Sequence, residues 1–389
     1  MNNYLSVLKQ ITHEKYQQLI QKENVNQNAV LASISLVQNE QDIILCSLGT
    51  GSKAVGLNHM NEQNHCLHSC HAEVIAKRGF QLWLYEIFSN PDEIDRYFEK
   101  QEKKYQLKKE YKVCFYVTQP PCGQAQLFPE SQIYGLSAAR PFSEFQKETE
   151  NIPNCDPKRL RSTPANSKTP IQQKNPSFCC TDKLMIWNVV GIQGALLNKY
   201  INPIYIDNLI IEFREKFSLK QVFDVRKRSG KSKNDVLKIN NKSISKSFRI
   251  QKPKLIYTKK NLFPYSPYHP KNDELNKRIN RDINQQSLQS FSYLYVNSFG
   301  TEKINSINGL KWGITKKDIQ KLQFLPKITK YHLFQKFKEL YGSLESKHLQ
   351  CNYRDAKNSN IKYLCLKMNI KKCFQEWSLD KTQFEQFQL

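Results

Sequence analysis

Near the amino terminus, apolar positions first follow the short runs of strands and then the spacing of a helix. Apolar runs at 30–37 and 43–48, with polar residues between them, predict a strand hairpin followed by a loop at 49–53. From Ala72 to about Phe88, apolar residues recur on one helical face without a proline, and Asn90-Pro91 ends the pattern. We therefore expect a helix that begins just after His71.

The middle of the chain continues to alternate between strand and helix patterns. Residues Tyr111 to Thr118 alternate as in a strand, which Pro120-Pro121 ends. Residues Asp182 to Asn198 have helical spacing without a proline, and Ile204 to Phe213 is another strand candidate. This order predicts an α/β fold with a central sheet covered by helices.

Two stretches lack a regular pattern. Residues from about 129 to 176 are polar and punctuated by proline, which predicts a long loop or insertion. A second, Lys-rich stretch at about 220–270 is expected to be a surface loop, and we expect its basic part, Arg226 to Lys254, to contact phosphates. The tail from Lys316 to Leu389 is mostly helical by pattern. We interpret the whole chain, residues 1–389, as one domain that contains both insertions.

The net charge of the chain indicates a polyanionic partner. The 389 residues include 59 Lys and Arg against 35 Asp and Glu, a formal net charge of +24 that favours RNA as a partner. A codon or solubility bias would also enrich lysine. No signal peptide and no run of about 18 apolar residues occurs, so we expect a soluble intracellular protein without a membrane partner. In a reducing compartment the 11 Cys are thiols or metal ligands.

One set of residues suggests metal chemistry. His71 and Glu73 at the expected helix start, followed by Pro121-Cys122 at a strand end, match H-x-E and P-C of the zinc deaminase signature. The second Cys of that signature is replaced by Ala125. Cys180, at the start of the next expected helix, is the candidate third ligand, with Cys179 as its competitor.

Such a ligand set explains why these residue types are needed. Three protein ligands leave one tetrahedral position on zinc for a water molecule, whose pKa the metal lowers toward roughly 7. A carboxylate at Glu73 would then transfer protons to the purine N1 and to the departing ammonia.

Longer segments resemble a known family. The chain is similar to the deaminase domain shared by the double-stranded RNA adenosine deaminases and the related tRNA-specific adenosine deaminase. The resemblance implies a cytidine-deaminase-like three-layer α/β/α sandwich with a mixed central sheet, elaborated by carboxy-terminal helices. The segments that carry it are Cys70 to Arg78, Pro120 to Gly123, Cys180 to Lys183, Trp187 to Gly194, Asn308 to Lys317 and Pro326 to Lys330.

The resemblance also implies particular site residues. Zinc would be held by His71, Cys122 and Cys180, with Glu73 as the proton shuttle, and we expect RNA contacts at Ser52 and Lys53. The family buries an inositol hexakisphosphate as a second cofactor. The matching positions are Lys77, Arg78, Ser177, Lys183, Trp187, Gln193, Lys347, Tyr353, Lys357 and Trp377, although the chain departs from the family pattern at His68, Gln124, Ile186 and Ser343.

The substrate implied by the resemblance is tRNA rather than double-stranded RNA or DNA. Only about 30 residues precede Val30, and the tail resembles the tRNA branch, so we expect deamination of the adenosine immediately 3′ of the anticodon in alanine tRNA. Two alternatives remain open: editing of mRNA hairpins by a bare deaminase domain, with or without an accessory RNA-binding subunit, and a catalytically silent RNA-binding protein.

Overall fold

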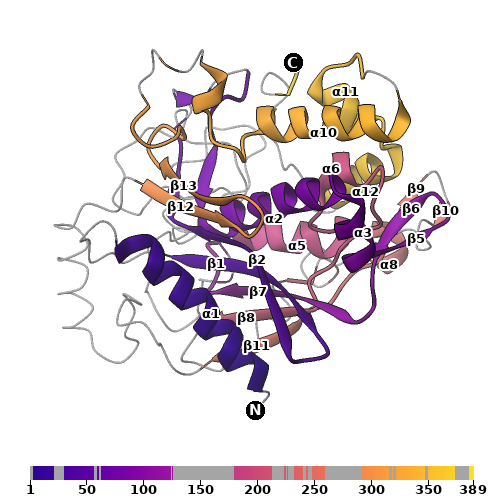
Figure 1. Cartoon of the computed structure of the whole chain (residues 1–389). Coiled ribbons are helices and arrows are strands. Elements are labelled where there is room, and N and C mark those ends of the chain that lie inside the picture. The colour runs from indigo at the N-terminus through magenta and orange to yellow at the C-terminus, as the bar shows by residue number, and fades with distance from the viewer. Residues whose placement is uncertain are drawn as a thin grey trace, which may run out of the picture.

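A seven-stranded sheet lies at the centre of the computed structural model (Figure 1). Its order is β11 (Lys254–Thr258), β8 (Asn208–Glu212), β7 (Tyr111–Val117), β1 (Leu31–Gln38), β2 (Asp42–Thr50), β12 (Phe291–Val296) and β13 (Gly300–Asn305). The structure describes residues 3–21, 30–56, 59–60, 63–123, 125, 179–212, 223–224, 226, 232–239, 242–243, 248–258, 291–314, 318, 321–346, 349–372 and 385–389.

The sheet is mixed. Strands β11, β8 and β7 run parallel to one another, whereas β7 pairs with β1, β1 with β2, β2 with β12, and β12 with β13 in antiparallel fashion. Parallel neighbours require crossover connections, which place helices on the sheet. The predicted α/β fold with a central mixed sheet is confirmed.

Helix α1 (Asn3–Ile20) covers one face of the sheet. Its apolar stripe, with Tyr4, Leu8 and Tyr16, is buried against Leu31 and Tyr116 of the strands below. This helix was not among the sequence predictions, although its apolar residues recur at helical spacing.

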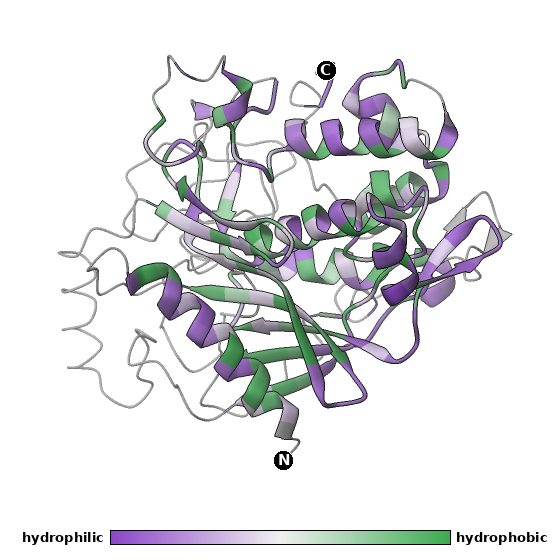
Figure 2. Cartoon of the chain, viewed as in Figure 1, coloured by the Kyte–Doolittle hydropathy of each residue, from purple (hydrophilic) through white to green (hydrophobic). Residues whose placement is uncertain are grey.

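The opposite face carries α2 (Ala72–Phe88) and α5 (Cys180–Val190). In β1, Ala32, Ile34 and Leu36 belong to the core on this side, whereas Leu31 and Val37 belong to the core beneath α1. A strand that is buried on both faces is apolar almost throughout, as the run at 30–37 is. Figure 2 shows the corresponding concentration of hydrophobic residues along the central strands and both helices.

The remaining elements surround these layers. The hairpin of β3 and β4 lies beside the start of α2, and α10 packs on α2 and α6 while α12 packs on α5. None of the described helices is both long enough and apolar enough to cross a membrane. The further bounds are β3 (Ser52–Ala54), β4 (Ser69–His71), α3 (Pro91–Tyr97), β5 (Phe98–Gln101), β6 (Lys104–Leu107), α6 (Gly194–Leu197), α8 (Lys233–Val236), β9 (Lys238–Ile239), β10 (Lys242–Ser243), the 3-10 helix η7 (Leu322–Phe324), α10 (Lys330–Glu345), α11 (Tyr353–Asn358) and α12 (Ile361–Lys372).

The predicted hairpin, the helix after His71 and the strand at Tyr111 are confirmed. The helix expected over 182–198 is instead interrupted, because Gly191 adopts a φ of 80° and α6 starts only at Gly194. The loop expected at 49–53 already contains the start of β3.

The expectation of a surface loop throughout the Lys-rich stretch is also wrong in part. Residues 254–258 form β11 in the central sheet, and Val236, Leu237 and Phe248 are buried against α5 and α12. Apolar side chains separated by lysines here provide a packing surface that charge content obscured. The polar stretch at 129–176 lies outside the described residues.

Candidate metal centre and active site

His71 is placed by a close contact between β2 and α2. It ends β4 and precedes α2 in an extended conformation, with φ −73° and ψ 140°, and its side chain makes no capping hydrogen bond. The backbone N–H of Ala72 donates to Gly51 O at 2.7 Å. A Cβ at Gly49 would lie 2.6 Å from Ala72 O, so only glycine lets the strand approach the helix start this closely.

Cys122 and Cys180 are joined by the contact between the loop after β7 and the start of α5. The backbone N–H of Thr181 donates to Cys122 O at 3.0 Å, and its hydroxyl donates to Pro121 O at 3.0 Å. The backbone N–H of Cys180 donates to Cys122 Sγ at 3.2 Å. A helix N-terminus thus faces the sulfur and favours its anionic form.

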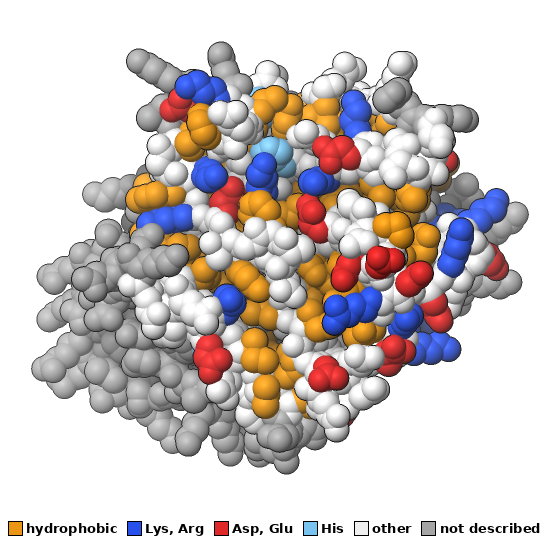
Figure 3. Space-filling view, viewed as in Figure 1, with side chains coloured by type: hydrophobic (Ala, Val, Ile, Leu, Met, Phe, Trp, Pro, Cys, Tyr) orange, Lys and Arg blue, Asp and Glu red, His pale blue; other side chains and the backbone are white. Residues whose placement is uncertain are grey.

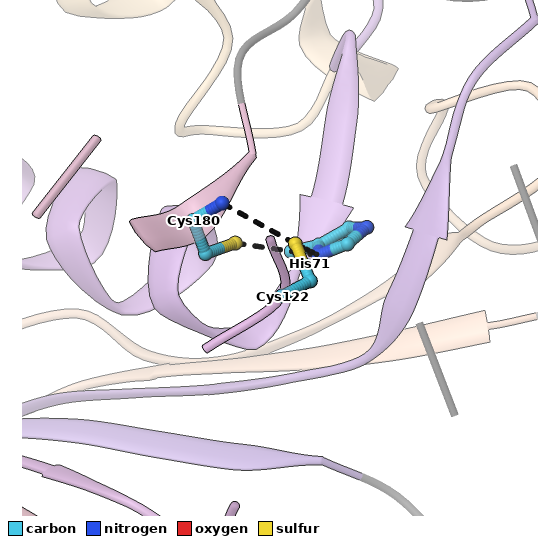
Figure 4. Close-up of side chains that lie close together, drawn as sticks. All are labelled: His71, Cys122 and Cys180. Atoms are coloured by element: carbon cyan, nitrogen blue, oxygen red, sulfur yellow. Dashed lines mark hydrogen bonds between the residues drawn. The ribbon is translucent and has the colours of Figure 1, made fainter. Parts of the chain in front are cut away.

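The three side chains converge on one point (Figure 4). His71 Nδ1 lies 3.6 Å from Cys122 Sγ and 3.3 Å from Cys180 Sγ, and all three donor atoms lie within 4.8 Å of one another. Tetrahedral zinc bonds imply donor separations of about 3.5 to 3.8 Å. The His/Cys/Cys set is buried and is consistent with a zinc site with one position left for water.

Glu73 completes this group. Cys180 Sγ donates to Glu73 Oε2 at 3.2 Å, and Glu73 is 2% exposed. Burial, followed by the charge of Cys122, raises the pKa of Glu73 to about 7. Burial and the neighbouring Cys122 sulfur likewise raise the pKa of the Cys180 thiol, and a bound dication would stabilise the Cys180 thiolate.

Cys179 has a different role from Cys180. Its sulfur accepts a hydrogen bond from the backbone N–H of Asp182 at 3.4 Å and caps α5. Among the described residues, the set that can hold a metal contains Cys180 and does not contain Cys179.

A second cluster gathers largely buried cations between α2 and the carboxy-terminal elements. Glu385 pairs with Lys357 Nζ at 2.6 Å and with Lys330 Nζ at 3.5 Å. Burial, together with Arg78, Lys367 and Lys357, lowers the pKa of Lys77 well below its usual range. The Arg78 guanidinium donates to Ile328 O at 2.6 Å.

The remaining residues expected to hold inositol hexakisphosphate are spread around this cluster. Tyr353 stacks on Phe387 beneath Lys357, and Trp187 lies 6.0 Å from Lys77 Nζ. Lys183 interacts electrostatically with Glu73 and Cys180 instead. The side-chain amide of Gln193 forms hydrogen bonds with the backbone through both its nitrogen and its oxygen. In this structure Gln193 therefore stabilises the break between α5 and α6. Ser177, Lys347 and Trp377 lie outside the described residues.

The two residues expected to contact RNA lie beside one candidate metal ligand, His71. Ser52 pairs with His71, and Lys53 pairs with Cys70, across the β3–β4 hairpin. Both are half-buried, and burial lowers the pKa of Lys53. Their position fits RNA contacts, which stay a prediction.

A comparison with known protein families decides the family. The model of the adenosine-deaminase (editase) domain matches residues 47–382, which include all three candidate ligands and Glu73. The chain belongs to this family. The buried His/Cys/Cys triad of this editase domain is therefore a candidate zinc site of an adenosine deaminase acting on RNA.

Relatives of this editase domain fall into two groups. Over 89% of its length, the chain is 23% identical to the double-stranded RNA-specific adenosine deaminase of Mus musculus, of which the match spans 29%. It is 27% identical over 82% of its length to tRNA-specific adenosine deaminase 1 of Drosophila melanogaster, of which the match spans 77%. The corresponding enzyme of Saccharomyces cerevisiae is 22% identical over 54% of the chain and 57% of that protein.

Lys330 and Glu385, which take part in the cation cluster of the editase domain, were not predicted from the sequence. Lys330 stands in a segment that carried the family resemblance, but nothing in its sequence context distinguished it from neighbouring lysines. Glu385 is a lone acidic residue near the carboxy terminus, and only the folded chain places it between Lys330 and Lys357.

Proposed function

We propose that the protein is a zinc-dependent enzyme that hydrolyses adenosine to inosine in tRNA, with release of ammonia. The observation that carries this proposal is the buried Glu73 carboxyl, which lies 3.2 Å from one member of the His71, Cys122 and Cys180 triad. A carboxyl beside an open zinc position is the arrangement that a hydrolytic nucleobase deaminase requires.

Each residue has a distinct part in this reaction. His71, Cys122 and Cys180 would hold zinc, which supplies Lewis-acid activation of water when bound. Glu73 accepts a proton from the water that attacks C6, passes it to the purine N1, and assists protonation of the amino group that leaves as ammonia. A pKa of about 7 suits this role because the carboxyl both accepts and donates protons near neutrality.

The tRNA substrate is supported by the extent of the match to the Drosophila tRNA-specific enzyme, of which 77% is covered. Within tRNA, we propose the adenosine immediately 3′ of the anticodon in alanine tRNA as the target. A base in a loop costs less to extrude than one in a duplex. The similarity to the double-stranded RNA-specific enzyme over 89% of the chain makes an mRNA hairpin the second candidate substrate.

The test is deamination by the purified protein of alanine tRNA, of its anticodon stem-loop and of an adenosine-containing RNA hairpin. Inosine is read by sequencing, with Glu73→Gln as the inactive control of equal shape. Inosine at the proposed position in tRNA alone supports the proposal. Inosine in the hairpin alone would identify the second candidate, and binding of these RNAs by the zinc-loaded protein without any inosine would identify a silent RNA-binding protein.

We further propose inositol hexakisphosphate as a structural cofactor and a cytidine-deaminase-like three-layer arrangement as the fold type. The cofactor proposal is supported by Lys77, Arg78, Lys330 and Lys357, which converge beside the carboxylate of Glu385. Buried cations in this number repel one another unless a polyanion compensates them. Mass spectrometry of the denatured protein should detect the released compound, and its absence from active enzyme would exclude it.

A further inference from the structure

Two rings and a lysine form a cluster on the surface of β12 and β13 that the proposed catalytic chemistry does not use. Lys303 Nζ lies 4.0 Å from the ring centroid of Phe291 and 4.4 Å from that of Trp312. The two rings meet edge to face, with their centroids 5.1 Å apart and an interplanar angle of 74°. The ammonium group is therefore held directly against both rings.

Backbone pairing fixes the positions of these side chains. Lys303 pairs with Tyr293 in the hairpin, and the backbone N–H of Trp312 donates to Lys303 O at 2.8 Å. The turn before Trp312 is also fixed, since the backbone N–H of Leu67 donates to Gly309 O at 2.8 Å. The cluster is thus formed before any partner binds, which reduces the entropy lost on binding.

The cluster presents an apolar surface next to a positive charge. Trp312 is 41% exposed and is one of only a few large hydrophobic residues exposed in the described part of the chain. Figure 3 shows hydrophobic and basic side chains next to one another over β12 and β13.

This surface borders the end of the sheet where the metal ligands lie. The Ser292 hydroxyl donates to Cys70 O at 3.3 Å, immediately before His71 in the chain. The backbone N–H of Tyr293 donates to Thr50 Oγ1 at 2.8 Å, at the end of β2. Ser292, the chain neighbour of Phe291 in β12, therefore contacts the β3–β4 hairpin, which ends at the candidate ligand His71.

We infer that Phe291, Lys303 and Trp312 form a stacking platform for an unpaired base of the substrate RNA near the edited adenosine, with Lys303 contacting a phosphate. Aromatic rings beside cations bind single-stranded nucleic acid in this way, because every base offers a flat π-face and every nucleotide a negative charge. Bases in a duplex are already stacked, so the platform favours a loop. The inference rests on the proposed function and specifies how that substrate is held.

The test uses an anticodon stem-loop in which 2-aminopurine replaces, one at a time, the loop nucleotides around the edited adenosine. In the wild-type protein, 2-aminopurine fluorescence should be quenched at one of these positions by stacking. Trp312→Ala should abolish that quenching and raise the Kd for the stem-loop about tenfold, within the range for loss of one base stack. The kcat at saturating RNA should stay within about twofold, since the rings touch no reacting atom.

Matched variants separate stacking from general effects. Phe299→Ala removes an aromatic side chain that is 38% exposed at the turn of the same hairpin, and it should leave both Kd and quenching unchanged. Trp312→Phe should restore most of the affinity. Lys303→Gln should weaken binding and reduce the salt slope of log Kd by about 0.7, the value for one phosphate of a single strand.

The possible failures are distinguishable. If the wild-type protein edits the stem-loop but Trp312→Ala and Phe299→Ala bind it equally well, the platform is refuted and the proposed function stands. If the wild-type protein neither edits nor binds any of the RNAs, the proposed function fails, and the inferred platform fails with it.

Discussion

Contacts of single atoms distinguish the two candidate cysteine ligands. Cys180 and its competitor Cys179 are adjacent in the chain, but the Cys179 sulfur accepts the backbone N–H of Asp182, whereas the Cys180 sulfur faces His71 Nδ1 at 3.3 Å. The start of α5 turns the two side chains in different directions. One caps the helix, and the other completes the candidate metal centre.

Replacing these cysteines should therefore have different effects. We expect Cys180→Ala to lose most of its zinc, because two protein ligands bind zinc far more weakly than three. Cys179→Ala should retain zinc but lose about 1 kcal/mol of stability, because α5 loses its cap. Metal analysis by mass spectrometry and thermal unfolding measure the two effects. Equal zinc content in both variants would contradict the ligand assignment.

His13 is a second residue whose surroundings determine its chemistry. On α1 it lies beneath the sheet face, and its Nε2 lies 2.6 Å from the Tyr116 hydroxyl. Burial, followed by the charge of Lys9, lowers the pKa of His13 to about 3. The neutral imidazole is thus the form that the folded protein accommodates.

This lowered pKa predicts acid sensitivity. Because the folded-state pKa of His13 lies below the ordinary value near 6.5, its contribution to stability is complete above pH 6.5 and is lost as the pH falls toward 3. By pH 5 the free energy of unfolding should have fallen by about 2 kcal/mol through this residue. The measurement is urea unfolding of wild type and His13→Gln at pH 7.5 and 5. Both proteins share any effect of zinc release, so the difference between them gives the contribution of His13 to the pH dependence. An unchanged pH dependence in the variant would contradict the prediction.

At the level of elements, the carboxy-terminal segment stabilises the packing of α10 and α11. Phe387 stacks on Tyr353 with the ring centroids 5.0 Å apart, and its carbonyl accepts the Tyr353 N–H at 3.0 Å. Glu385 reaches Lys357 and Lys330, whose side chains are 16% and 13% exposed. The segment therefore supplies both apolar contact and the described counter-charge of the cation cluster.

Removing that charge should be costly. We expect Glu385→Gln to lower the free energy of unfolding by about 3 kcal/mol, because two largely buried ammonium groups lose their carboxylate while the shape is kept. The matched control is Glu40→Gln, since the exposed pair of Glu40 and Lys112 at 2.8 Å should contribute less than about 1 kcal/mol. Urea unfolding measures both. Added inositol hexakisphosphate should restore much of the loss in Glu385→Gln, and equal losses in the two variants would argue against a buried role for Glu385.

For the whole molecule, charge governs the encounter with RNA. A formal net charge of +24 attracts a polyanion from a distance and makes its binding depend on salt. The Lys-rich stretch cannot be tested by deletion, because Val236, Leu237 and Phe248 within it are buried in a hydrophobic cluster with α5 and α12. Its exposed lysines can be neutralised singly without loss of that packing.

Neutralising exposed lysines of this stretch should flatten the salt dependence of tRNA binding. We expect the double variant Lys233→Gln and Lys254→Gln to reduce the slope of log Kd against log salt by about 1.4 to 1.8, if each contacts one phosphate. Lys103→Gln with Lys109→Gln, two exposed lysines near the β5–β6 hairpin, provides the control of equal charge change. Filter binding over a range of salt gives both slopes. Identical slopes in the two double variants would show that the stretch affects binding only through net charge.

Local order along the chain was sufficient to predict much of the fold and the candidate metal centre. Helix α2 and the β1–β2 hairpin follow from periodicity, which reports the face of each element that is buried. The motif His71-x-Glu73 with Pro121-Cys122 is also local, because ligand type and spacing are properties of short segments.

Only the tertiary structure decided what depends on segments far apart in the chain. Three such contacts join elements whose sequences give no sign that they pair. They are Glu385 with Lys330, His13 with Tyr116, and Trp312 with Lys303. Residues 254–258 belong to a Lys-rich stretch, yet they form a strand of the central sheet because they pair with β8. A single-sequence pattern records which side chains avoid water, whereas the identity of the partner that removes them from water is a property of the folded chain.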